Sequence, residues 1–323
     1  MKTALLTAIG SFSADAVIQS LKKQGIKIIG TDIYPKEWIV NAYSVDSFYQ
    51  VPLGTNREKY LDAIQRICEE NAVDYLLPLT DVEIDTLKDR RELFVHRGIT
   101  LCISQEDAID VCRNKLNTFQ RLKNCGFDSV LIPTYSGIVY DTLEESLFPI
   151  ICKPVNGRNS QGIKRFSSKE KLDFFFRSVN PEDYIIQPIV PGFVVTVDIV
   201  RSPKTGHAVA VPRKELLRTQ SGAGTSVHVF CDDELVRLCV QIADALNVIG
   251  CVNFEFIQKS DGTYHFLECN PRFSGGVKFS CMTGYDFIQN HLNCFLGKDI
   301  DSAKPYLPCY IARKYEELVT SFE

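Results

Sequence analysis

The sequence lacks any apolar run that approaches the length needed to cross a lipid bilayer. It opens with a lysine and a short apolar stretch, but these residues continue directly into a strand–turn–helix pattern, which is not the layout of a signal peptide. It also lacks a strong excess of either charge, because the net charge is −4 over 323 residues. This balance gives no sign of a nucleic-acid or membrane surface, and we expect a cytoplasmic protein.

The twelve cysteines form no C-x-x-C pair and no Cys/His cluster with the spacing of a zinc site. They are scattered singly, many of them inside apolar runs, which favours reduced thiols packed as small hydrophobic side chains. The five histidines are isolated and match no catalytic triad or metal spacing. We therefore assign no catalytic role to either residue type.

Two common nucleotide-binding motifs are also absent. The first third of the chain alternates apolar strands at 3–8, 27–31 and 75–79 with helices at 14–24 and 57–70, which predicts a parallel sheet with helices on both faces. Only Gly10 of a G-x-G-x-x-G fingerprint is present, so a nicotinamide site is disfavoured although Asp32 stands at the distance of a ribose-binding acid. The Walker motif G-x-x-x-x-G-K-[ST] is missing altogether.

The most informative stretch that is present runs from Phe266 to Gly276. Side chains two apart on an extended strand share a face, so Glu268, Asn270 and Arg272 can be presented together. Two oxygen ligands beside a guanidinium suit a magnesium-bound polyphosphate. The alternative is a strand end followed by a polar turn.

A second stretch places Lys153 at the end of a buried strand over 150–154, followed by a loop with Gly157, Ser160 and Gly162. The lysine would supply charge from a fixed strand, and backbone N–H groups of the loop could fold over phosphates as a flap. A β-hairpin with a glycine-rich turn is the alternative.

The remaining pattern predicts a long helical segment around 105–135 and then an antiparallel sheet with helices. We expect a helix near 233–246, and strands near 163–166, 184–190, 193–201, 206–212, 226–230, 250–258 and 263–270.

The order of five features resembles the ATP-grasp superfamily, in its carbamoyl-phosphate-synthase-like branch of carboxylate–amine ligases. These features are Lys115, Lys153 with its loop, the segment 184–192, the strand Cys251–Phe256 and the Glu268–Arg272 string. The resemblance covers nearly the whole chain. It implies an α/β fold with a doubly wound parallel-sheet domain followed by a two-lobed α+β ATP-grasp domain. The expected boundaries are 1–110 for a Rossmann-like pre-ATP-grasp domain, 111–186 for the small lobe and 187–323 for the large lobe.

The resemblance also implies a role for each matching residue. Glu255, Glu268 and Asn270 match the magnesium (or manganese) ligands, and Arg272 matches the arginine that steadies the transferring phosphoryl group. The expected nucleotide contacts are Lys115, Lys153, Gly157, Ser160, Gly162, Gln187 and the backbone of Ile189. Lys115 could instead be a solvated helix lysine, and Gln187 an ordinary strand residue.

One position departs from the family pattern, because Val194 stands where a glutamate usually helps to hold the ribose hydroxyls. Downstream, Arg213 is our first choice for the residue that meets the carboxylate substrate or the acyl phosphate, and Arg218 is the second. A basic surface hairpin is the alternative for this segment. Asp81 and Glu83 follow a strand at the edge where doubly wound sheets bind ligands, and they could contact an amino group or simply cap a helix.

The resemblance implies a magnesium-dependent ligase that uses ATP to activate a carboxylate as an acyl phosphate and joins it to an amine. Its expected partners are ATP, a small carboxylate and an amine, with no nucleic acid or membrane, and a homodimer is left open. The alternative is a nucleotide-binding or regulatory protein with weak or no ligase activity. Synthesis of carbamoyl phosphate is disfavoured, because that enzyme uses two tandem ATP-grasp halves.

Overall fold

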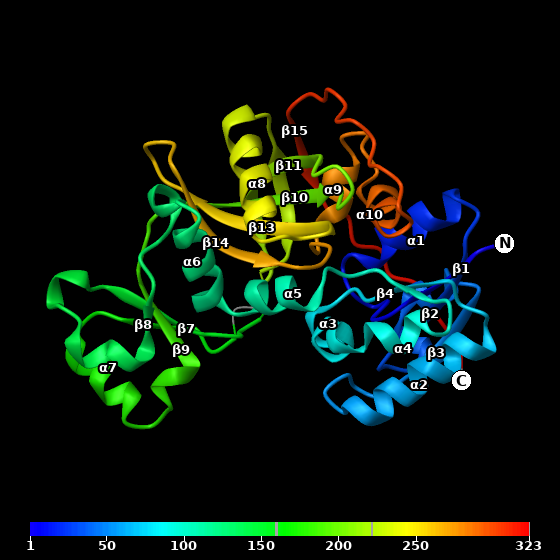
Figure 1. Ribbon diagram of the computed structural model, residues 1–323, viewed down its shortest axis with the longest axis horizontal. Coiled ribbons are helices and arrows are strands. Elements are labelled where there is room, and N and C mark those ends of the chain that lie inside the picture. The colour runs from blue at the N-terminus through cyan, green and yellow to red at the C-terminus, as the bar shows by residue number, and fades with distance from the viewer. Residues whose placement is uncertain (159–160, 221, 323) are drawn as a thin grey trace.

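A computed structural model describes residues 1–158, 161–220 and 222–322. Its strands form three sheets that follow one another in space, with the N-terminal sheet at one end, a small sheet at the other and the largest sheet between them (Figure 1). Short 3-10 segments connect several elements, at Lys36–Trp38, Val40–Tyr43, Lys88–Arg90, Asp128–Val130, Gly137–Thr142, Glu145–Leu147 and Pro181–Asp183.

The N-terminal sheet is parallel, in the order β3-β2-β1-β4-β5. Its strands are β1 (Thr3–Leu6), β2 (Lys27–Asp32), β3 (Ser47–Gln50), β4 (Tyr75–Leu77) and β5 (Thr100–Leu101), and its helices are α1 (Ala14–Lys23), α2 (Arg57–Glu70), α3 (Asp81–Leu87) and α4 (Arg91–Val95). Helix α1 ends where the sequence indicates, because Gly25 adopts a positive φ of 70° that favours glycine.

The helical segment expected around 105–135, with its end at Gly126, is observed as two helices, α5 (Glu106–Arg113) and α6 (Lys115–Asn124), and not as one. Asn114 breaks them with an extended conformation (φ −103°, ψ 108°). Its side chain accepts a hydrogen bond from the Asn117 N–H, which caps α6. The break places Lys115 in the first turn of a new helix.

The small sheet has the order β6-β9-β7-β8 and is covered by α7 (Lys169–Phe176). Its strands are β6 (Tyr135–Ser136), β7 (Ile150–Pro154), β8 (Lys164–Phe166) and β9 (Tyr184–Pro188). A small core of buried side chains joins helix and sheet, built from Leu143, Ile150, Cys152, Leu172, Phe176 and Ile186.

The largest sheet is antiparallel, in the order β14-β13-β10-β11-β12-β15. Its strands are β10 (Phe193–Arg201), β11 (Ala208–Arg218), β12 (Gly224–Val229), β13 (Gly250–Gln258), β14 (Tyr264–Asn270) and β15 (Cys309–Ala312), and its helices are α8 (Asp233–Ala245), α9 (Val277–Cys281) and α10 (Phe287–Phe295). Strand β11 runs six residues beyond the expected end at 212, so the basic segment from Arg213 to Arg218 is ordered strand.

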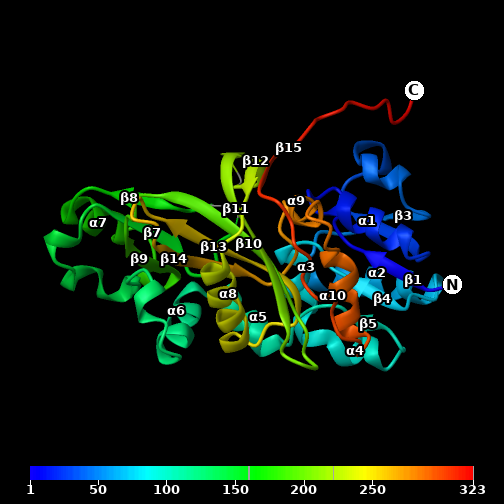
Figure 2. The same cartoon turned by 90° about the horizontal axis from the view of Figure 1, so that it is seen from above.

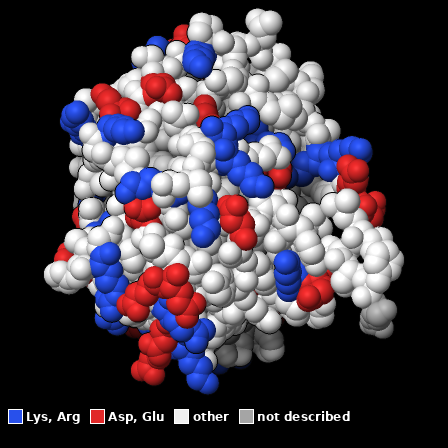
Figure 3. Space-filling view, turned by 90° about the vertical axis from the view of Figure 1, so that its right-hand side faces the viewer, with Lys and Arg blue, Asp and Glu red and all other residues white. Residues whose placement is uncertain are grey.

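The N-terminal sheet and the largest sheet share one hydrophobic core, and helices α1 and α10 contact each other between them. One core cluster contains Ala4 and Leu6 of β1 together with Val200 of β10 and Phe287 of α10. The Ser20 hydroxyl donates to the Asp286 carboxylate across this contact, at 2.7 Å. The segment beyond β15 leaves the largest sheet (Figure 2), and its Thr320 hydroxyl donates to the Glu37 carbonyl of the N-terminal domain at 2.6 Å. The face toward the viewer in Figure 3 carries interspersed charges of both signs, in keeping with the small net charge.

The predicted fold class is confirmed by this arrangement. The domain boundaries stay a prediction, and the one after residue 186 falls inside β9. Among the helices of the described residues, none is long and apolar enough to span a membrane.

Candidate active site

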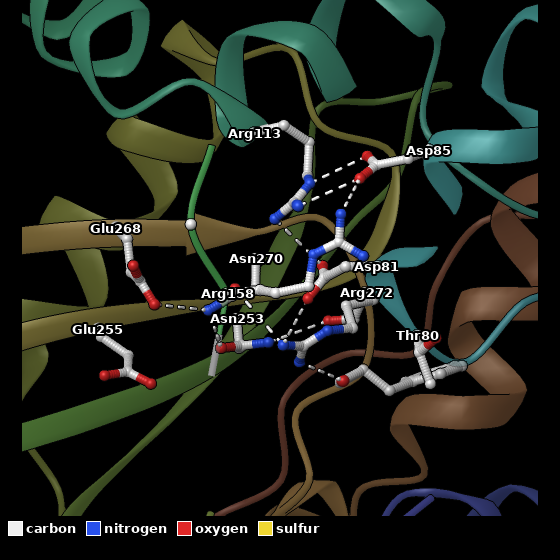
Figure 4. Close-up of polar contacts among 12 residues, drawn as sticks. Thr80, Asp81, Asp85, Arg113, Arg158, Asn253, Glu255, Glu268, Asn270 and Arg272 are labelled. Atoms are coloured by element: carbon white, nitrogen blue, oxygen red, sulfur yellow. Dashed lines mark hydrogen bonds and ion pairs between the residues drawn. The ribbon is translucent and has the colours of Figure 1, made fainter. Parts of the chain in front are cut away.

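Two carboxylates face each other on neighbouring strands of the largest sheet. Antiparallel pairing places Glu255 of β13 opposite Glu268 of β14, and Asn253 opposite Asn270. The Asn270 amide donates to Asn253 Oδ1 at 3.2 Å and to Glu268 Oε1 at 3.3 Å. In Figure 4, Asn253 and Asn270 lie between the two carboxylates and Arg272. Strand alternation therefore presents the acids and amides on one face, as the sequence predicts.

The two acids have opposite electrostatic environments. Burial, and then repulsion from Glu268, raise the pKa of Glu255. Burial also opposes ionisation of Glu268, but Lys115 and Lys153 outweigh it and hold the pKa of Glu268 below its usual value. A further positive charge beside Glu255 would therefore stabilise the ionised form of the pair.

The cations come from two elements outside that sheet. Lys115 lies in the first turn of α6, where its Nζ is 3.5 Å from Glu268 Oε2 and donates to the Gly157 carbonyl at 3.0 Å. Lys153 stands on β7, and burial lowers its pKa while the attraction of Glu268 opposes that shift. Lys115 is thus no solvated helix residue, and it ties the glycine-rich loop to the acids.

The glycine-rich loop follows β7, and two of its glycines lie against Pro154. Gly162 has a positive φ of 72°, and a Cβ there would come within 2.7 Å of Pro154 Cγ. The Arg158 guanidinium donates to Asp85 Oδ2 of α3 at 3.0 Å. This contact joins the loop to the N-terminal domain. Ser160, an expected nucleotide contact, lies outside the described residues.

Arg272 belongs to a network of alternating charges. Its Nη2 donates to Asp81 Oδ2 at 3.1 Å, and Asp81 Oδ1 lies 3.6 Å from Arg113 Nη1. Arg113 also pairs with Asp85, with Nε and Oδ1 3.0 Å apart. Burial opposes ionisation of Asp81, but Arg272 and Arg113 keep its pKa below the usual value. The network holds Arg272 near Asn270 (Figure 4).

Two of the expected nucleotide contacts, Gln187 and the backbone of Ile189, already have partners of their own. The Gln187 side chain is buried and donates to Thr134 Oγ1 at 2.7 Å. The Ile189 N–H donates to the Pro149 carbonyl at 3.2 Å, so its backbone offers a ligand only the carbonyl oxygen. Val194 lies on β10 opposite Ile257 and supplies no carboxylate.

Arg213 is 1% exposed and held by several groups. Its Nη1 donates to Asp198 at 2.5 Å and to Ser280 at 3.0 Å, and its Nη2 donates to Ser274 at 2.9 Å. Its Nε lies 3.3 Å from a Glu215 oxygen. Few of its donors are left to grip a substrate carboxylate in a bidentate way.

Arg218 lies at the end of β11 and reaches Glu255 directly. Its Nη2 donates to both Glu255 oxygens, at 3.1 and 3.2 Å, and its Nε donates to the Gly222 carbonyl at 2.7 Å. Its side chain is 28% exposed, in contrast to that of Arg213. In this structure Arg218 is the positive charge beside Glu255.

A cavity of about 810 Å³ collects these groups. It is lined by both acids, both lysines, Asn270, Arg272, Arg213, Arg218 and Gly157, and it continues into the N-terminal domain. Gln187 and Ile189 are not among its described lining residues.

Four residues of this site were not assigned a role from the sequence: Asp85, Arg113, Asn253 and Arg158. Asn253 was detectable, because it stands two residues before Glu255 and shares its face of the strand. The other three form ion pairs between elements distant in sequence, so no local pattern marks them.

The donor set fits a magnesium ion. Within the described ranges, no group of three or more His, Cys, Asp or Glu side chains could hold a metal. The possible metal ligands of this site are two carboxylates and one amide oxygen. Magnesium is commonly bound by one or two carboxylates together with substrate phosphates. The raised pKa of Glu255 also indicates a site that gains from a bound cation.

Two family models match the chain. One, described as an ATP-grasp in the biosynthetic pathway with Ter operon, matches residues 180–316, and a PylC-like N-terminal domain model matches residues 5–102. The carbamoyl phosphate synthase large chain of Thermomicrobium roseum is 25% identical and is aligned over 87% of this chain and 27% of its own. The arginine-specific large chain of Eremothecium gossypii is 24% identical, over 88% of this chain and 26% of its own. The present chain therefore spans about a quarter of these relatives.

Solved structures share the fold at low identity. A biotin carboxylase complex with β-γ-ATP from Campylobacter jejuni has a TM-score of 0.78 and 17% identity, and covers 93% of this chain and 72% of its own. An L-amino acid ligase from Bacillus licheniformis has a TM-score of 0.71 and 18% identity, over 91% of this chain and 74% of its own. The predicted ATP-grasp resemblance is confirmed.

Proposed function

We propose that this chain is an ATP-dependent ligase that activates a carboxylate as an acyl phosphate and joins it to an amine. The observation that carries the proposal is the convergence of Glu255 and Glu268 with Lys115 and Lys153 on one cavity. Two acids alone would be a metal site, and two lysines alone an anion site. Together they suit a polyphosphate bound with its metal.

Glu255, Glu268 and the Asn270 oxygen would hold magnesium, or manganese in its place. When bound, the metal would neutralise charge on the phosphates and on the transferring phosphoryl group. Lys115 and Lys153 would bind phosphate oxygens, and the loop with Gly157, Ser160 and Gly162 would exclude water from the acyl phosphate. Arg272, held by Asp81, would stabilise the phosphoryl group in transfer.

The reaction has two displacements. A carboxylate oxygen forms a bond to the γ-phosphorus of ATP while the bond from that phosphorus to the ADP oxygen breaks, which releases ADP. The neutral amine then attacks the acyl carbon, and the acyl–oxygen bond breaks to release phosphate. The amine loses one proton as the amide forms. No side-chain nucleophile takes part.

Arg213 remains our prediction for a residue near the carboxylate, but its contacts favour a positioning role and assign direct recognition to Arg218. Metal at Glu255 would compete with the Arg218 guanidinium for the same oxygens. Arg218, once displaced, would be free to pair with the carboxylate substrate. Binding of the metal and of the substrate would then be linked through one side chain.

Several finer assignments stay proposals. Gln187 and Ile189 would contact the adenine, with Ile189 offering its carbonyl oxygen. The boundaries 1–110, 111–186 and 187–323 and a homodimer are likewise proposed. A cytoplasmic location is supported by the twelve cysteines, all of which carry free thiols.

The second candidate is a nucleotide-binding protein without ligase activity. Val194 and the existing partners of Gln187 and Ile189 favour it, because they alter the ribose and adenine end of the site. The acids and lysines at the phosphate end favour catalysis.

ADP release with magnesium and ATP, measured across a panel of carboxylates and amines, separates the two. The ligase predicts that at least one carboxylate–amine pair stimulates release above the rate with ATP alone. Nucleotide binding with no stimulation by any pair in a broad panel would favour the binding protein.

A further inference from the structure

Two turns of the chain line the cavity beside the guanidinium groups of the site. The first follows Arg218, between β11 and β12, and includes residues 222–224. The second closely follows Arg272 and comprises residues 274–276. All six of these residues line the cavity. Because each turn comes soon after an arginine of the site, the position of the turn affects where that arginine points.

Arg313, the first residue after β15, contacts both turns at once. Its backbone N–H donates to the Thr225 carbonyl at 2.8 Å, which continues the pairing of β15 with β12. Its Nε donates to the Gly224 carbonyl at 3.0 Å, and its Nη2 donates to the Gly275 carbonyl. The planar guanidinium offers its donors in a fixed geometry, so two nitrogen atoms of one side chain hold two turns that are distant in the sequence.

The same guanidinium lies against two aromatic rings from different domains. Its Cζ is 5.2 Å from the centre of the Phe12 ring and 4.9 Å from the centre of the Phe279 ring. Phe12 belongs to the loop between β1 and α1 of the N-terminal domain, whereas Phe279 belongs to α9. A guanidinium at this distance is attracted electrostatically to an aromatic ring. Arg313 therefore joins the N-terminal domain to the two turns.

The two turns and Phe12 lie close to one another. A Cβ on Gly275 would be 3.3 Å from the Phe12 Cβ and 3.7 Å from the Ala223 Cβ. Phe12, Ala223 and Gly275 all line the cavity, so they form one wall of it. Arg313 is not among the described residues that line the cavity. Its effect on a ligand would therefore be exerted through this wall.

Hydrogen bonds within the first turn connect the wall to Arg218. The Arg218 Nε donates to the Gly222 carbonyl at 2.7 Å. The Thr219 N–H donates to the Ala223 carbonyl at 2.9 Å, and the Gly222 N–H donates to the Thr219 carbonyl at 3.0 Å. Because the turn is bonded to itself and to Arg218, the hydrogen bond from Arg313 to this turn also constrains the Arg218 guanidinium.

We propose that Arg313 is a positioning residue for binding of the carboxylate substrate. It holds the two turns against each other and against Phe12, and it thereby keeps the Arg218 guanidinium directed into the cavity. The inference rests on the proposed function, in which Arg218 recognises the carboxylate. The segment after Arg313 adds a second contact with the N-terminal domain, because the Thr320 hydroxyl donates to the Glu37 carbonyl at 2.6 Å.

The first measurement follows Arg218 itself and needs no substrate. In a chain with isotope-labelled arginine, the NMR signal of the Arg218 Nε–H group is identified as the one lost in Arg218→Gln. Arg313→Lys keeps the charge but lacks the planar fork. We expect it to raise the rate at which the Arg218 Nε–H proton exchanges with water by about fivefold or more, because the turn that binds this group opens more often. Arg313→Gln should show the same increase.

Lys314→Gln is the matched control, because Lys314 is the next residue and its side chain is 84% exposed. Its exchange rate at Arg218 should equal that of the unaltered chain. Circular dichroism shows whether each variant is folded, and Arg313→Gln decides by the same criterion where Arg313→Lys does not fold. An unchanged rate in the folded Arg313 variant, or an equal change in Lys314→Gln, would overturn the inference.

The second measurement is the KM of the carboxylate in the ADP-release assay, with the carboxylate–amine pair that stimulates release. We expect Arg313→Lys to raise this KM about tenfold, since a hydrogen bond to a charged group corresponds to at least that factor. The KM of ATP should change by less than about twofold, whereas a general loss of structure would raise both.

A double variant tests the route through Arg218. In the Arg218→Gln background, Arg313→Lys should change the carboxylate KM by less than about twofold, because the two side chains act through one contact. A further rise of about tenfold in that background would show that Arg313 does not act through Arg218, and it would overturn the inference.

Failure of this inference is distinguishable from failure of the proposed function. Faster exchange at Arg218 in the Arg313 variants, without stimulated ADP release by the unaltered chain, would remove the ligase and leave Arg313 as the residue that positions Arg218. Stimulated ADP release with unchanged exchange at Arg218 would leave the ligase and remove the role of Arg313.

Discussion

Glu255 lies in an environment that opposes its negative charge. Glu255 is buried beside a second carboxylate, and both factors raise the free energy of its ionised form. The Arg218 guanidinium offsets only part of that cost. A carboxylate whose pKa is raised by folding stabilises the fold only below its unfolded pKa, and that contribution is lost as pH rises through the folded pKa. Ionisation of Glu255 in the folded protein therefore lowers the stability of the fold.

Glu255→Gln should accordingly separate activity from stability. We expect magnesium-dependent ADP formation to fall by about 100-fold or more, since a metal ligand is lost. The thermal midpoint of the metal-free protein at pH 7.5 should not fall, because the amide carries no charge to desolvate. Calorimetry and an ADP assay measure the two effects. Retained turnover with a midpoint lowered by several degrees would contradict the assignment.

At the scale of elements, the glycine-rich loop is joined to the N-terminal domain by the Arg158–Asp85 pair. Both side chains are about one-third exposed, at 32% and 30%, so the pair contributes roughly 0.2–1 kcal/mol. Asp85 also binds Arg113, and the helix that carries it is therefore held even without Arg158. The loop can be released without disturbing the network around Arg272.

Arg158→Gln should speed amide hydrogen exchange in residues 154–158 about two- to fivefold, because the loop loses its contact with α3. Mass spectrometry of that peptide measures the change. Arg57→Gln is a matched control, since it breaks a comparable exposed pair with Asp89 elsewhere in the same domain. Unchanged exchange in Arg158→Gln, or an equal change in the control, would show that the pair does not hold the loop.

Elements also show what the sequence can and cannot predict. Period-two alternation placed Glu268, Asn270 and Arg272 on one face, and the strands over 150–154 and 250–258 were expected with their observed bounds. The helix break at Asn114 was missed, because the apolar pattern continues across it and only a cap marks it. The Arg113, Asp85 and Arg158 contacts were missed because they join segments 28 and 73 residues apart.

For the whole molecule, His291 connects two domains. Its Nδ1 accepts from the Cys251 N–H at 2.9 Å, and its Nε2 lies 3.2 Å from the Cys102 carbonyl, so the neutral ring with a proton on Nε2 satisfies both contacts. Burial lowers the pKa of His291 to about 4. No motif or spacing in the sequence singles out this histidine from the other four.

This shift predicts that acid weakens the fold. The unfolded chain binds a proton at His291 below about pH 6.5, whereas the folded chain binds it only near pH 4. The free energy of unfolding therefore falls as pH drops from 6.5 to 4, by up to roughly 3 kcal/mol. His291→Gln keeps a donor and an acceptor without titrating, and should reduce the slope of unfolding free energy against pH between 6.5 and 4. Denaturant unfolding at several pH values measures it, and an unchanged slope would contradict the role.

The central claim is that Glu268 completes a metal and phosphate site used for carboxylate activation. The most direct measurement is the rate of ADP release, with magnesium and the stimulating carboxylate–amine pair, for the unaltered chain, Glu268→Ala and the control Glu234→Ala on the exposed surface of α8. We predict that Glu268→Ala loses stimulated ADP release while its circular dichroism spectrum stays unchanged, and that Glu234→Ala behaves like the unaltered chain. Undiminished release by folded Glu268→Ala would contradict the account.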